Sequence, residues 1–588
     1  MIKLSDYIAK ELENYGVKDV FMISGGGAMH LNDSFGHSKM RYICNHNEQA
    51  TAIAAEGYAR LNQNLAVVCV TTGPGGINAL NGVLGQWTDS APVLYISGQV
   101  KFSTTLASCP NLPLRQLGDQ EADIISIVKP ITKYAAMVKD PAEIKYHLQK
   151  AIYLATNGRS GPVWLDIPLN VQAALIDEKK LKSFKAPKEP KANLKIKEVF
   201  AALKNAKRPL IVAGHGIRLA GARESFNTLI KKLGLPVATT FNGFDLIENA
   251  SPYFVGRIGT VGQRAGNFAL QNADVVLFLG TRNNIRQVSY NWENFAKKAK
   301  KIVVDIDRAE LKKPTIKPDI AINANLADFI PALNAKISGP LGKKEWTTWC
   351  KERVKKYPPL AEFKIKDNAK VNPYFFTQTL TELAPQNAVV VASNATACLT
   401  LLQAGVVKSQ KQRMFSNSGD ASMGYGLPAA IGAALAASRN VYCLEGDGSI
   451  MMNLQELQTV KNYNLPIKIF ILNNNGYISI KQTQKNFFKR LCACGKSGGV
   501  IMPDFTALAK TLGLPAVKIS RNKNLKTVLK NILAKSGPLV CEVMLEEDYT
   551  FSPKLSAKKL PDGTMVSPSL EDMSPFLSKE EFESNIIK

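Results

Sequence analysis

The chain lacks the features of membrane-spanning and secreted proteins. It has no run of 18 or more apolar residues, the length from which a membrane-spanning helix becomes a candidate. Its first residues, MIKLSD, do not form the basic and then apolar pattern of a secretory signal. The nine cysteines are scattered and odd in number, which does not suit a disulfide framework. We therefore expect a cytoplasmic protein with no membrane partner.

Metal-binding cysteine and histidine clusters are also missing. Cys492 and Cys494 form a Cys-x-Cys pair, but no second pair or nearby histidine accompanies them. A structural zinc site normally needs four such ligands. The pair therefore indicates packing or a loop.

Acidic residues are scarce relative to basic ones. The chain has 48 Asp and Glu against 74 Lys and Arg, which gives a net charge of +26. Such a charge makes nucleic acid or anionic lipid a candidate partner. The lysines are spread along the chain, however, and no nucleic-acid-binding motif accompanies them. The pattern favours a solvated, lysine-rich surface, so we expect no nucleic-acid partner.

The length of 588 residues exceeds that of one ordinary domain. Short apolar runs alternate with helical patterns, which is typical of α/β folds with parallel sheets. A stretch rich in Lys, Pro and Glu at about 184–194 resembles a linker. We predict three doubly wound parallel-sheet domains, at residues 1–180, 195–335 and 370–550. A C-terminal tail without regular periodicity follows at residues 551–588.

The most informative stretch lies in the third of these domains. Residues 446–449 have the sequence GDGS and residues 473–476 have NNNG, each at the end of an apolar run. Carboxylate and carboxamide oxygens at neighbouring strand ends can share a hard cation, so Asp447 and Asn474 predict a Mg²⁺ site. A helix expected to begin near Asn453 would direct its N-terminus at an anion. The cation would keep open positions for phosphate oxygens.

The first domain contains a second set of motifs. Glu48 begins a predicted helix that includes the sequence AAEGYAR, and residues 72–78 have the sequence TGPGGIN. Taken alone, Glu48 fits an ordinary helix start, where the helix dipole favours a carboxylate. Taken together, the motifs of both domains resemble those of the thiamine-diphosphate-dependent 2-keto-acid enzymes, and most closely the large, catalytic subunit of acetolactate synthase. The resemblance extends from about residue 4 to residue 549.

The resemblance implies a pyrimidine-binding, a central Rossmann-like and a diphosphate-binding domain, with thiamine diphosphate and Mg²⁺ as cofactors. Glu48 would relay a proton at the pyrimidine ring, Met423 would wedge the cofactor into a bent shape, and Gln120 would hydrogen-bond the bound substrate. The implied metal ligands are Asp447, Asn474 and the carbonyl group of Gly476. Further implied cofactor contacts are Gly73, Asn78, Gly446, Gly448, Ser449, Asn473 and Gly476. The family also implies a homodimer or homotetramer.

The implied reaction is decarboxylation of a 2-keto acid, for which we expect pyruvate, and ligation of the two-carbon unit to a second carbonyl compound. The chain departs from the synthase pattern at two positions of the acceptor pocket. Asp119 takes the place of a Phe, and Thr483 takes the place of a Trp. Both changes make the pocket more polar. Transfer to a keto-sugar or another hydroxylated acceptor, or simple decarboxylation, therefore stands as an alternative to acetolactate formation.

The central domain permits two interpretations. Gly214 and Gly216 follow an apolar run as in a nicotinamide dehydrogenase, but the third glycine of the dinucleotide fingerprint is missing. Arg282 and Arg286 resemble the family's flavin site, although asparagines replace the acidic pair between them. Relatives without flavin keep this domain too. FAD is therefore an expected cofactor, with a flavin-free protein as the alternative.

Overall fold

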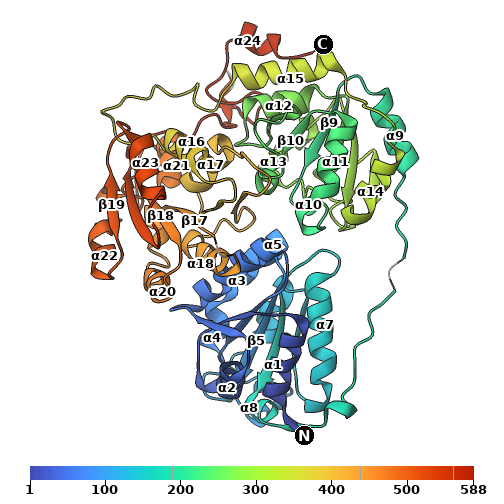
Figure 1. Ribbon diagram of the computed structural model, residues 1–588, viewed down its shortest axis with the longest axis vertical. Helices are drawn as coiled ribbons and strands as arrows, with labels where there is room; N and C mark the ends of the chain where they lie inside the picture. Colours follow the sequence, from blue (N-terminus) through green and yellow to red (C-terminus); the bar gives the residue numbers. More distant parts are fainter. Residues whose placement is uncertain (189, 438, 560–561, 588) are drawn as a thin grey trace.

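The computed structural model describes residues 1–188, 190–437, 439–559 and 562–587. Three domains follow one another along the chain, and each is built on a six-stranded parallel sheet with helices on both faces (Figure 1). The predicted fold class is confirmed. The first domain is joined to the second by an extended segment, in which residues 181–188 and 190–195 form neither helix nor strand.

The N-terminal domain has the strand order β3-β2-β4-β5-β7-β6. Its strands are β2 (Asp19–Met22), β3 (Arg41–Cys44), β4 (Ala66–Val70), β5 (Val93–Gln99), β6 (Tyr134–Met137) and β7 (Val163–Pro168). Its main helices are α1 (Leu4–Tyr15), α2 (Met29–His37), α3 (Glu48–Asn62), α4 (Pro74–Asn78), α5 (Leu80–Asp89) and α7 (Ile144–Thr156). The inner strands β2, β4, β5 and β7 are buried and mostly apolar because both faces of the sheet are covered, whereas the edge strand β3 is largely exposed.

The central domain has the strand order β11-β10-β9-β12-β13-β14. Its strands are β9 (Pro209–Ala213), β10 (Val237–Thr239), β11 (Phe254–Arg257), β12 (Val275–Leu279), β13 (Lys300–Asp305) and β14 (Ile320–Asn323). Its longer helices are α9 (Ile196–Asn205), α11 (Arg223–Leu233), α12 (Arg264–Asn272) and α14 (Leu326–Lys336). The strand order reverses between β9 and β12, and ligands of open α/β sheets bind at such a reversal.

The C-terminal domain has the strand order β16-β15-β17-β18-β20-β19. Its strands are β15 (Val389–Ala392), β16 (Arg413–Ser416), β17 (Val441–Gly446), β18 (Ile467–Asn473), β19 (Ala516–Ile519) and β20 (Leu539–Met544). Its main helices are α16 (Pro373–Leu383), α17 (Thr396–Ala404), α18 (Gly426–Ala436), α20 (Glu456–Asn462), α21 (Ile478–Phe488), α22 (Phe505–Thr511) and α23 (Leu525–Leu533). Helix α15 (Lys344–Lys356) lies in the polar stretch between the central and C-terminal domains.

Helices α3 and α18 join the N-terminal and C-terminal domains (Figure 1). Glycines make this close packing possible, because a Cβ atom on Gly57 or Gly432 would collide with the backbone of the facing helix. Small side chains fill the rest of the contact, and the apolar residues of both helices belong to one buried cluster. The two domains therefore share a core within one chain.

One local prediction was wrong. No helix begins at Asn453; the chain instead forms the single-turn helix α19 (Asp447–Ile450), then turns, then α20. The Asn453 side chain donates a hydrogen bond to the Gly424 carbonyl (2.8 Å). Helix α18 begins at Gly426, and Pro428 lies in its first turn, where proline is tolerated.

The tail is more regular than its sequence suggests. It contains a short hairpin of β21 (Lys558–Lys559) and β22 (Met565–Val566), and a terminal helix α24 (Lys579–Ser584). It lies over helix α12 of the central domain, where Asn267 donates to the Leu570 carbonyl (3.0 Å) and Arg264 to the Met573 carbonyl (3.1 Å). In the described residues no helix is both long and apolar enough to cross a membrane.

Candidate active site

Asp447 and Asn474 lie at the carboxyl ends of the adjacent strands β17 and β18. Both side chains are buried. Asp447 Oδ2 accepts hydrogen bonds from the backbone N–H groups of Asn474 (3.1 Å) and Gly476 (2.9 Å), and Oδ1 accepts one from Gly448 (2.7 Å). Asn474 Nδ2 donates to the Gly476 carbonyl (2.9 Å). The three predicted metal ligands are therefore held together in one turn.

The chemistry of this turn fits a hard cation. Burial raises the pKa of Asp447 to about 6, against the opposing effect of the three N–H donors. A bound cation would stabilise the ionised carboxylate. In the described parts of the chain no group of three or more His, Cys, Asp or Glu side chains could hold a metal ion. With one carboxylate, the turn needs further oxygen ligands from a bound anion, and a diphosphate supplies them.

A second turn is tied to this one through Ser449. Its hydroxyl lies 2.7 Å from Ser393 Oγ and accepts the N–H of Gly424 (2.8 Å). Gly424 has a φ of +86°, and a Cβ there would lie 2.6 Å from Asn453 Nδ2. Half-buried Met423 directly precedes this glycine. The predicted wedge residue is thus fixed relative to Asp447 by hydrogen bonds of its neighbours.

The other predicted cofactor contacts in this domain have structural partners. A Cβ on Gly448 would collide with the Tyr477 ring, and one on Gly476 with the Cys494 carbonyl. The Asn473 amide donates to Glu542 Oε1 (2.7 Å), so its side chain holds the loop in place. These residues shape the turn that carries the metal ligands.

The N-terminal domain brings its own predicted residues together. Asn78 Nδ2 donates to Glu48 Oε2 (3.1 Å). Gly73, with a φ of +58°, lies against the Gln120 backbone so closely that a Cβ would collide with the Gln120 carbonyl. Gln120 itself has a φ of +59°, a conformation unusual for a residue other than glycine. Four residues that are distant in sequence therefore form one site.

Glu121 holds the loop that carries this site. Its carboxylate accepts backbone N–H groups of Leu106 (2.5 Å), Leu117 (3.2 Å) and Gly118 (3.1 Å). Glu121 is buried, whereas its neighbours Asp119 and Gln120 are exposed. The buried carboxylate thus fixes the loop and leaves the two predicted substrate-facing side chains open.

The two sets of residues lie apart within one chain. Glu48, expected to be buried, is only half-buried, and Asn78 and Gln120 are exposed. In the described part of the chain no hydrogen bond or ion pair joins this set to Met423, Asp447 or Asn474. Hydrogen bonds between the two domains involve other residues: Tyr425 donates to Glu56 (3.2 Å), and Glu456 accepts from Asn45 (2.8 Å) and from the backbone N–H of His46 (2.9 Å). Glu56 is eight residues from Glu48, or about 12 Å along helix α3.

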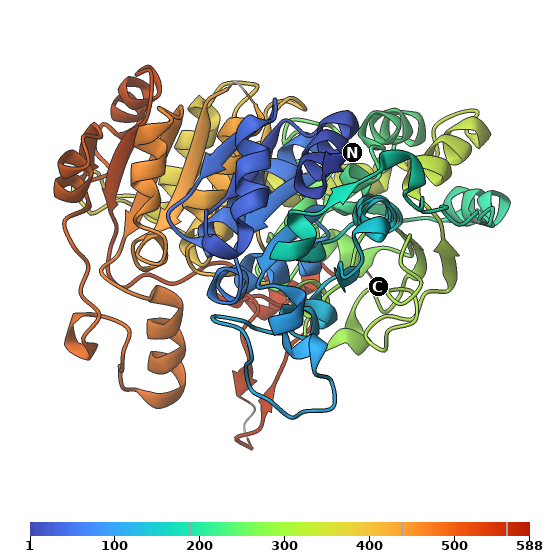
Figure 2. The ribbon, with the colours of Figure 1, turned by 90° about the horizontal axis from the view of Figure 1, so that it is seen from below.

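Thr483 lies in the C-terminal domain, as do Asp447 and Asn474. It is exposed on helix α21, and its hydroxyl donates to the Ser479 carbonyl of the preceding turn (3.0 Å). Asp119 belongs to the N-terminal set. Figure 2 shows α21, the loop around residues 100–120 and the tail hairpin extending on the same side of the molecule.

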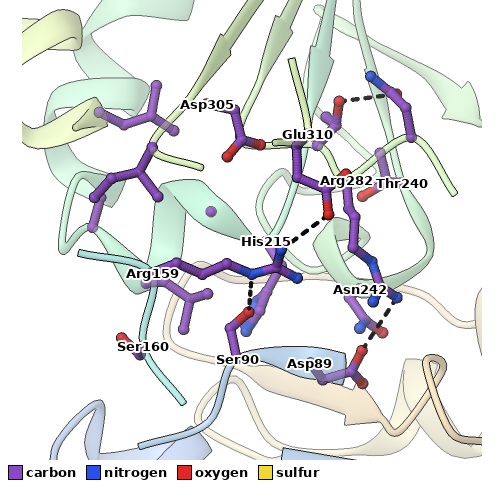
Figure 3. A pocket seen from close by; sticks show the side chains of 18 of the residues that line it. Asp89, Ser90, Arg159, Ser160, His215, Thr240, Asn242, Arg282, Asp305 and Glu310 are labelled. Carbon is purple, nitrogen blue, oxygen red and sulfur yellow. Dashed lines mark hydrogen bonds and ion pairs between the residues drawn. The ribbon is translucent and has the colours of Figure 1, made fainter. Parts of the chain in front are cut away.

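A separate cavity of about 260 Å³ lies at the strand-order reversal of the central domain (Figure 3). Its walls come from the turns after the central strands, from the N-terminal domain and from Ser418 of the C-terminal domain. Arg282 lines it, whereas Arg286 is not one of the lining residues and places its guanidinium over the Phe241 ring (5.2 Å). Only one of the two arginines predicted for flavin therefore faces the cavity.

Two arginines bridge the domains across this cavity. Arg159 donates to Ser90 Oγ (3.0 Å) and pairs with Asp307 (2.8 Å) and Glu310 (3.0 Å). Arg282 donates to the Thr88 carbonyl (2.6 Å). Figure 3 shows both side chains reaching across the space between the domains.

Two further groups of the cavity wall have altered acidity. Burial raises the pKa of Asp305 to about 6. Burial and nearby arginines hold the pKa of His215 well below its usual range, and its buried Nδ1 has no hydrogen-bond partner in the described structure. Guanidinium donors and a carboxylate acceptor suit the diphosphate and ribose groups of a dinucleotide.

Sequence reasoning missed Arg159, His215 and Asp305. A signal was available for the last two, because His215 follows β9 and Asp305 ends β13, at the carboxyl ends of strands, where parallel sheets bind ligands. Arg159 carried no such signal, since it comes from a loop of a different domain. Its place in the cavity depends on how the domains pack.

Comparison with known proteins gives three matches to family models along the chain. Residues 2–127 match the thiamine pyrophosphate enzyme N-terminal TPP binding domain, residues 196–333 the central domain, and residues 395–543 the C-terminal TPP binding domain.

Individual relatives match over nearly the whole chain. Acetolactate synthase 1, chloroplastic, of Zea mays is 32% identical over 566 residues, covering 92% of this chain and 85% of the relative. The acetolactate synthase large subunit of Lactococcus lactis subsp. lactis is 31% identical and covers 94% of both chains. The probable acetolactate synthase large subunit of Methanocaldococcus jannaschii is 31% identical, covering 93% of this chain and 92% of the relative.

Proposed function

This chain belongs to the thiamine pyrophosphate enzymes and is of the acetolactate synthase type, and we propose that it decarboxylates pyruvate and ligates the two-carbon unit to a second carbonyl compound. One observation carries the proposal. The N-terminal domain holds Glu48 and Asn78 together, here called the Glu48 set with Gly73 and Gln120, and the C-terminal domain holds the Asp447 set, which is Asp447, Asn474 and Gly476. Each of these domains matches the corresponding cofactor-binding family model.

Thiamine diphosphate, when bound, supplies the carbon nucleophile for attack on a keto group and the electron sink for loss of CO₂. Asp447, Asn474 and the Gly476 carbonyl would hold Mg²⁺ and, through it, the diphosphate. Met423 would pack against the cofactor and hold it bent. Glu48 would donate or accept the proton at the pyrimidine N1′ atom, which is the only proton transfer assigned here to a side chain.

We infer that two copies of the chain form each active site. Within the described part of one chain, Asn78 and Gln120 of the Glu48 set are exposed, and no hydrogen bond or ion pair joins this set to Asp447 or Met423. Helix packing between the two domains fixes this separation, because α3 and α18 are in tight contact. A second copy would bring its Asp447 set to the open Glu48 set, so the active form is at least a homodimer.

The acceptor is proposed from Asp119 and Thr483. Both side chains are exposed; Asp119 precedes Gln120 in the loop of the N-terminal domain, and Thr483 lies on helix α21, which follows the metal turn. A small hydroxyl side chain and a carboxylate leave room and hydrogen-bonding capacity for a hydroxylated acceptor. An apolar acceptor would leave these groups unpaired at a cost in affinity. A keto-sugar or related carbonyl compound is therefore the second candidate, beside a second pyruvate.

FAD is proposed for the central cavity. Arg159 and Arg282 would hold its diphosphate, and Asp305 would accept from a ribose hydroxyl. No step of the reaction is assigned to it. A flavin spectrum of the purified protein that disappears in an Arg282→Met variant would support this assignment, and a colourless wild-type protein that binds no added FAD would contradict it.

The test of the proposed function is product analysis by mass spectrometry. The protein is incubated with thiamine diphosphate, Mg²⁺ and pyruvate, first alone and then with 2-ketobutyrate or a keto-sugar. Ligated product with any acceptor supports carboligation. Acetaldehyde as the sole product with every acceptor would show a simple decarboxylase.

A further inference from the structure

Lys481 is a buried lysine whose hydrogen-bond acceptors are backbone carbonyl groups. It lies on helix α21 with 7% of its surface exposed. Its ammonium group donates to the backbone carbonyls of Asn475 (2.9 Å) and Asn474 (3.3 Å). In the described part of the chain it forms no ion pair, whereas Lys485, one turn further along, pairs with exposed Asp548. Its hydrogen-bond acceptors are all neutral, and its charge also favours the ionised forms of the nearby Asp447 and Glu547 carboxylates. A buried charge is costly unless negative charge around it offsets it.

The acceptors of this lysine belong to the predicted metal turn. Of the three successive carbonyl groups in the turn, those of Asn474 and Asn475 accept from Lys481. The third, that of Gly476, accepts in the described structure only from the Asn474 side chain (2.9 Å). The lysine therefore orients two carbonyls towards α21, and it leaves the Gly476 carbonyl as the one available to a cation.

The lysine is itself held in place by a second loop. Gly495 of this loop lies close to the Lys481 side chain. A Cβ atom added to Gly495 would lie only 3.0 Å from Lys481 Cε, so a larger residue at position 495 would require the lysine to shift. Gly495 forms a bridge to Gly476, and the N–H of Tyr477 donates to the Cys494 carbonyl (2.9 Å). The ammonium group is thus enclosed between the metal turn, the helix and the loop after it.

We propose that Lys481 is a positioning residue of the magnesium–diphosphate site, which selects the Gly476 carbonyl as the backbone ligand and supplies a fixed positive charge that the bound diphosphate offsets. This inference rests on the proposed function for the identity of the anion. The orientation of the turn does not depend on the anion, because it follows from the two hydrogen bonds of Lys481 alone.

The test compares Lys481→Met with the control Lys485→Met. Methionine keeps the length of the side chain but removes the charge and all donors. Hydrogen exchange of the cofactor-free proteins, followed by mass spectrometry over residues 472–482, reports on the turn. We expect faster exchange in Lys481→Met than in wild type, and wild-type exchange at residues 472–477 in Lys485→Met.

Titration with thiamine diphosphate at saturating Mg²⁺ reports on the charge. We expect the Kd for thiamine diphosphate to rise about tenfold or more in Lys481→Met, since interactions with charged groups are the stronger ones. The kcat at saturating cofactor should stay within about threefold of wild type. Unchanged exchange together with an unchanged Kd overturns the proposal, as does an equal loss in Lys485→Met. A lower Tm with unchanged Kd also overturns it, because the role is then structural only. If wild type binds no thiamine diphosphate, the proposed function fails, and the exchange experiment still decides whether Lys481 orients the turn.

Discussion

Complementation between two inactive variants should restore a defined fraction of activity. Glu48→Gln and Asp447→Ala each remove one essential group of the proposed two-chain site. Each variant alone should lose activity by about 10²–10⁴-fold or more, as is common for general acid–base residues. In the described part of one chain, no hydrogen bond or ion pair joins the residues around Glu48 to those around Asp447.

The expected recovery follows from the symmetry of a dimer. Equal amounts of the two chains, mixed by co-expression, give one half hybrid dimers. In a hybrid, one site combines both substitutions and the other combines Glu48 of one chain with Asp447 of its partner. One site in two is then intact, so the mixture should show about 25% of wild-type activity. If each site were built from a single chain, the mixture would stay inactive.

A second mixture serves as the control. Wild type is co-expressed with a chain that carries both substitutions. If each site is shared between two chains, both sites of a hybrid dimer carry one of the two substitutions. Only the wild-type dimers are then active, so about 25% of activity remains. Single-chain sites would leave about 50%. An inactive first mixture together with a half-active second mixture would refute the two-chain site.

Three other results are expected. Glu48→Gln should bind thiamine diphosphate but exchange its C2 proton about 10²–10⁴-fold more slowly by NMR, and exchange at the wild-type rate would remove Glu48 from the proton relay. Thiamine diphosphate should raise the Tm only with Mg²⁺ present. This gain in Tm should shrink as the pH falls below about 6. Burial raises the pKa of Asp447 to about 6, so at lower pH its carboxylate is protonated and cannot bind the cation. A gain in Tm that survives in Asp447→Ala would place the cation elsewhere. Thr483→Trp should fill the acceptor pocket and favour small acceptors over hydroxylated ones. The measurement is the product ratio in a competition among pyruvate, 2-ketobutyrate and a keto-sugar. An unchanged product ratio would place Thr483 outside the pocket.

The sequence was sufficient for the fold and for the ligands that lie within one motif. Buried parallel strands are apolar on both faces, and the residues after them, such as Asp447 and Asn474, lie at one edge of the sheet. Their proximity therefore follows from strand order alone. The close approach of Glu48 and Asn78 follows in the same way from motifs within one domain.

What the sequence did not reveal depends on contacts between distant segments. Asn453 has a sequence compatible with a helix start, but its amide is used by the Gly424 carbonyl, so the helix begins later. Arg159 lines the central cavity only because the first domain packs against the second. The burial of Lys481 follows from the position of the metal turn, whose carbonyl groups accept its hydrogen bonds.

The most direct test of the central claim is the release of labelled CO₂ from [1-¹³C]pyruvate by the purified protein. The measurement is made with and without thiamine diphosphate and Mg²⁺, for wild type and Glu48→Gln. The account predicts rapid release by wild type that requires both cofactors, and a rate lower by about 10²-fold or more in the variant. Release that is independent of thiamine diphosphate, or equal in the two proteins, would contradict it.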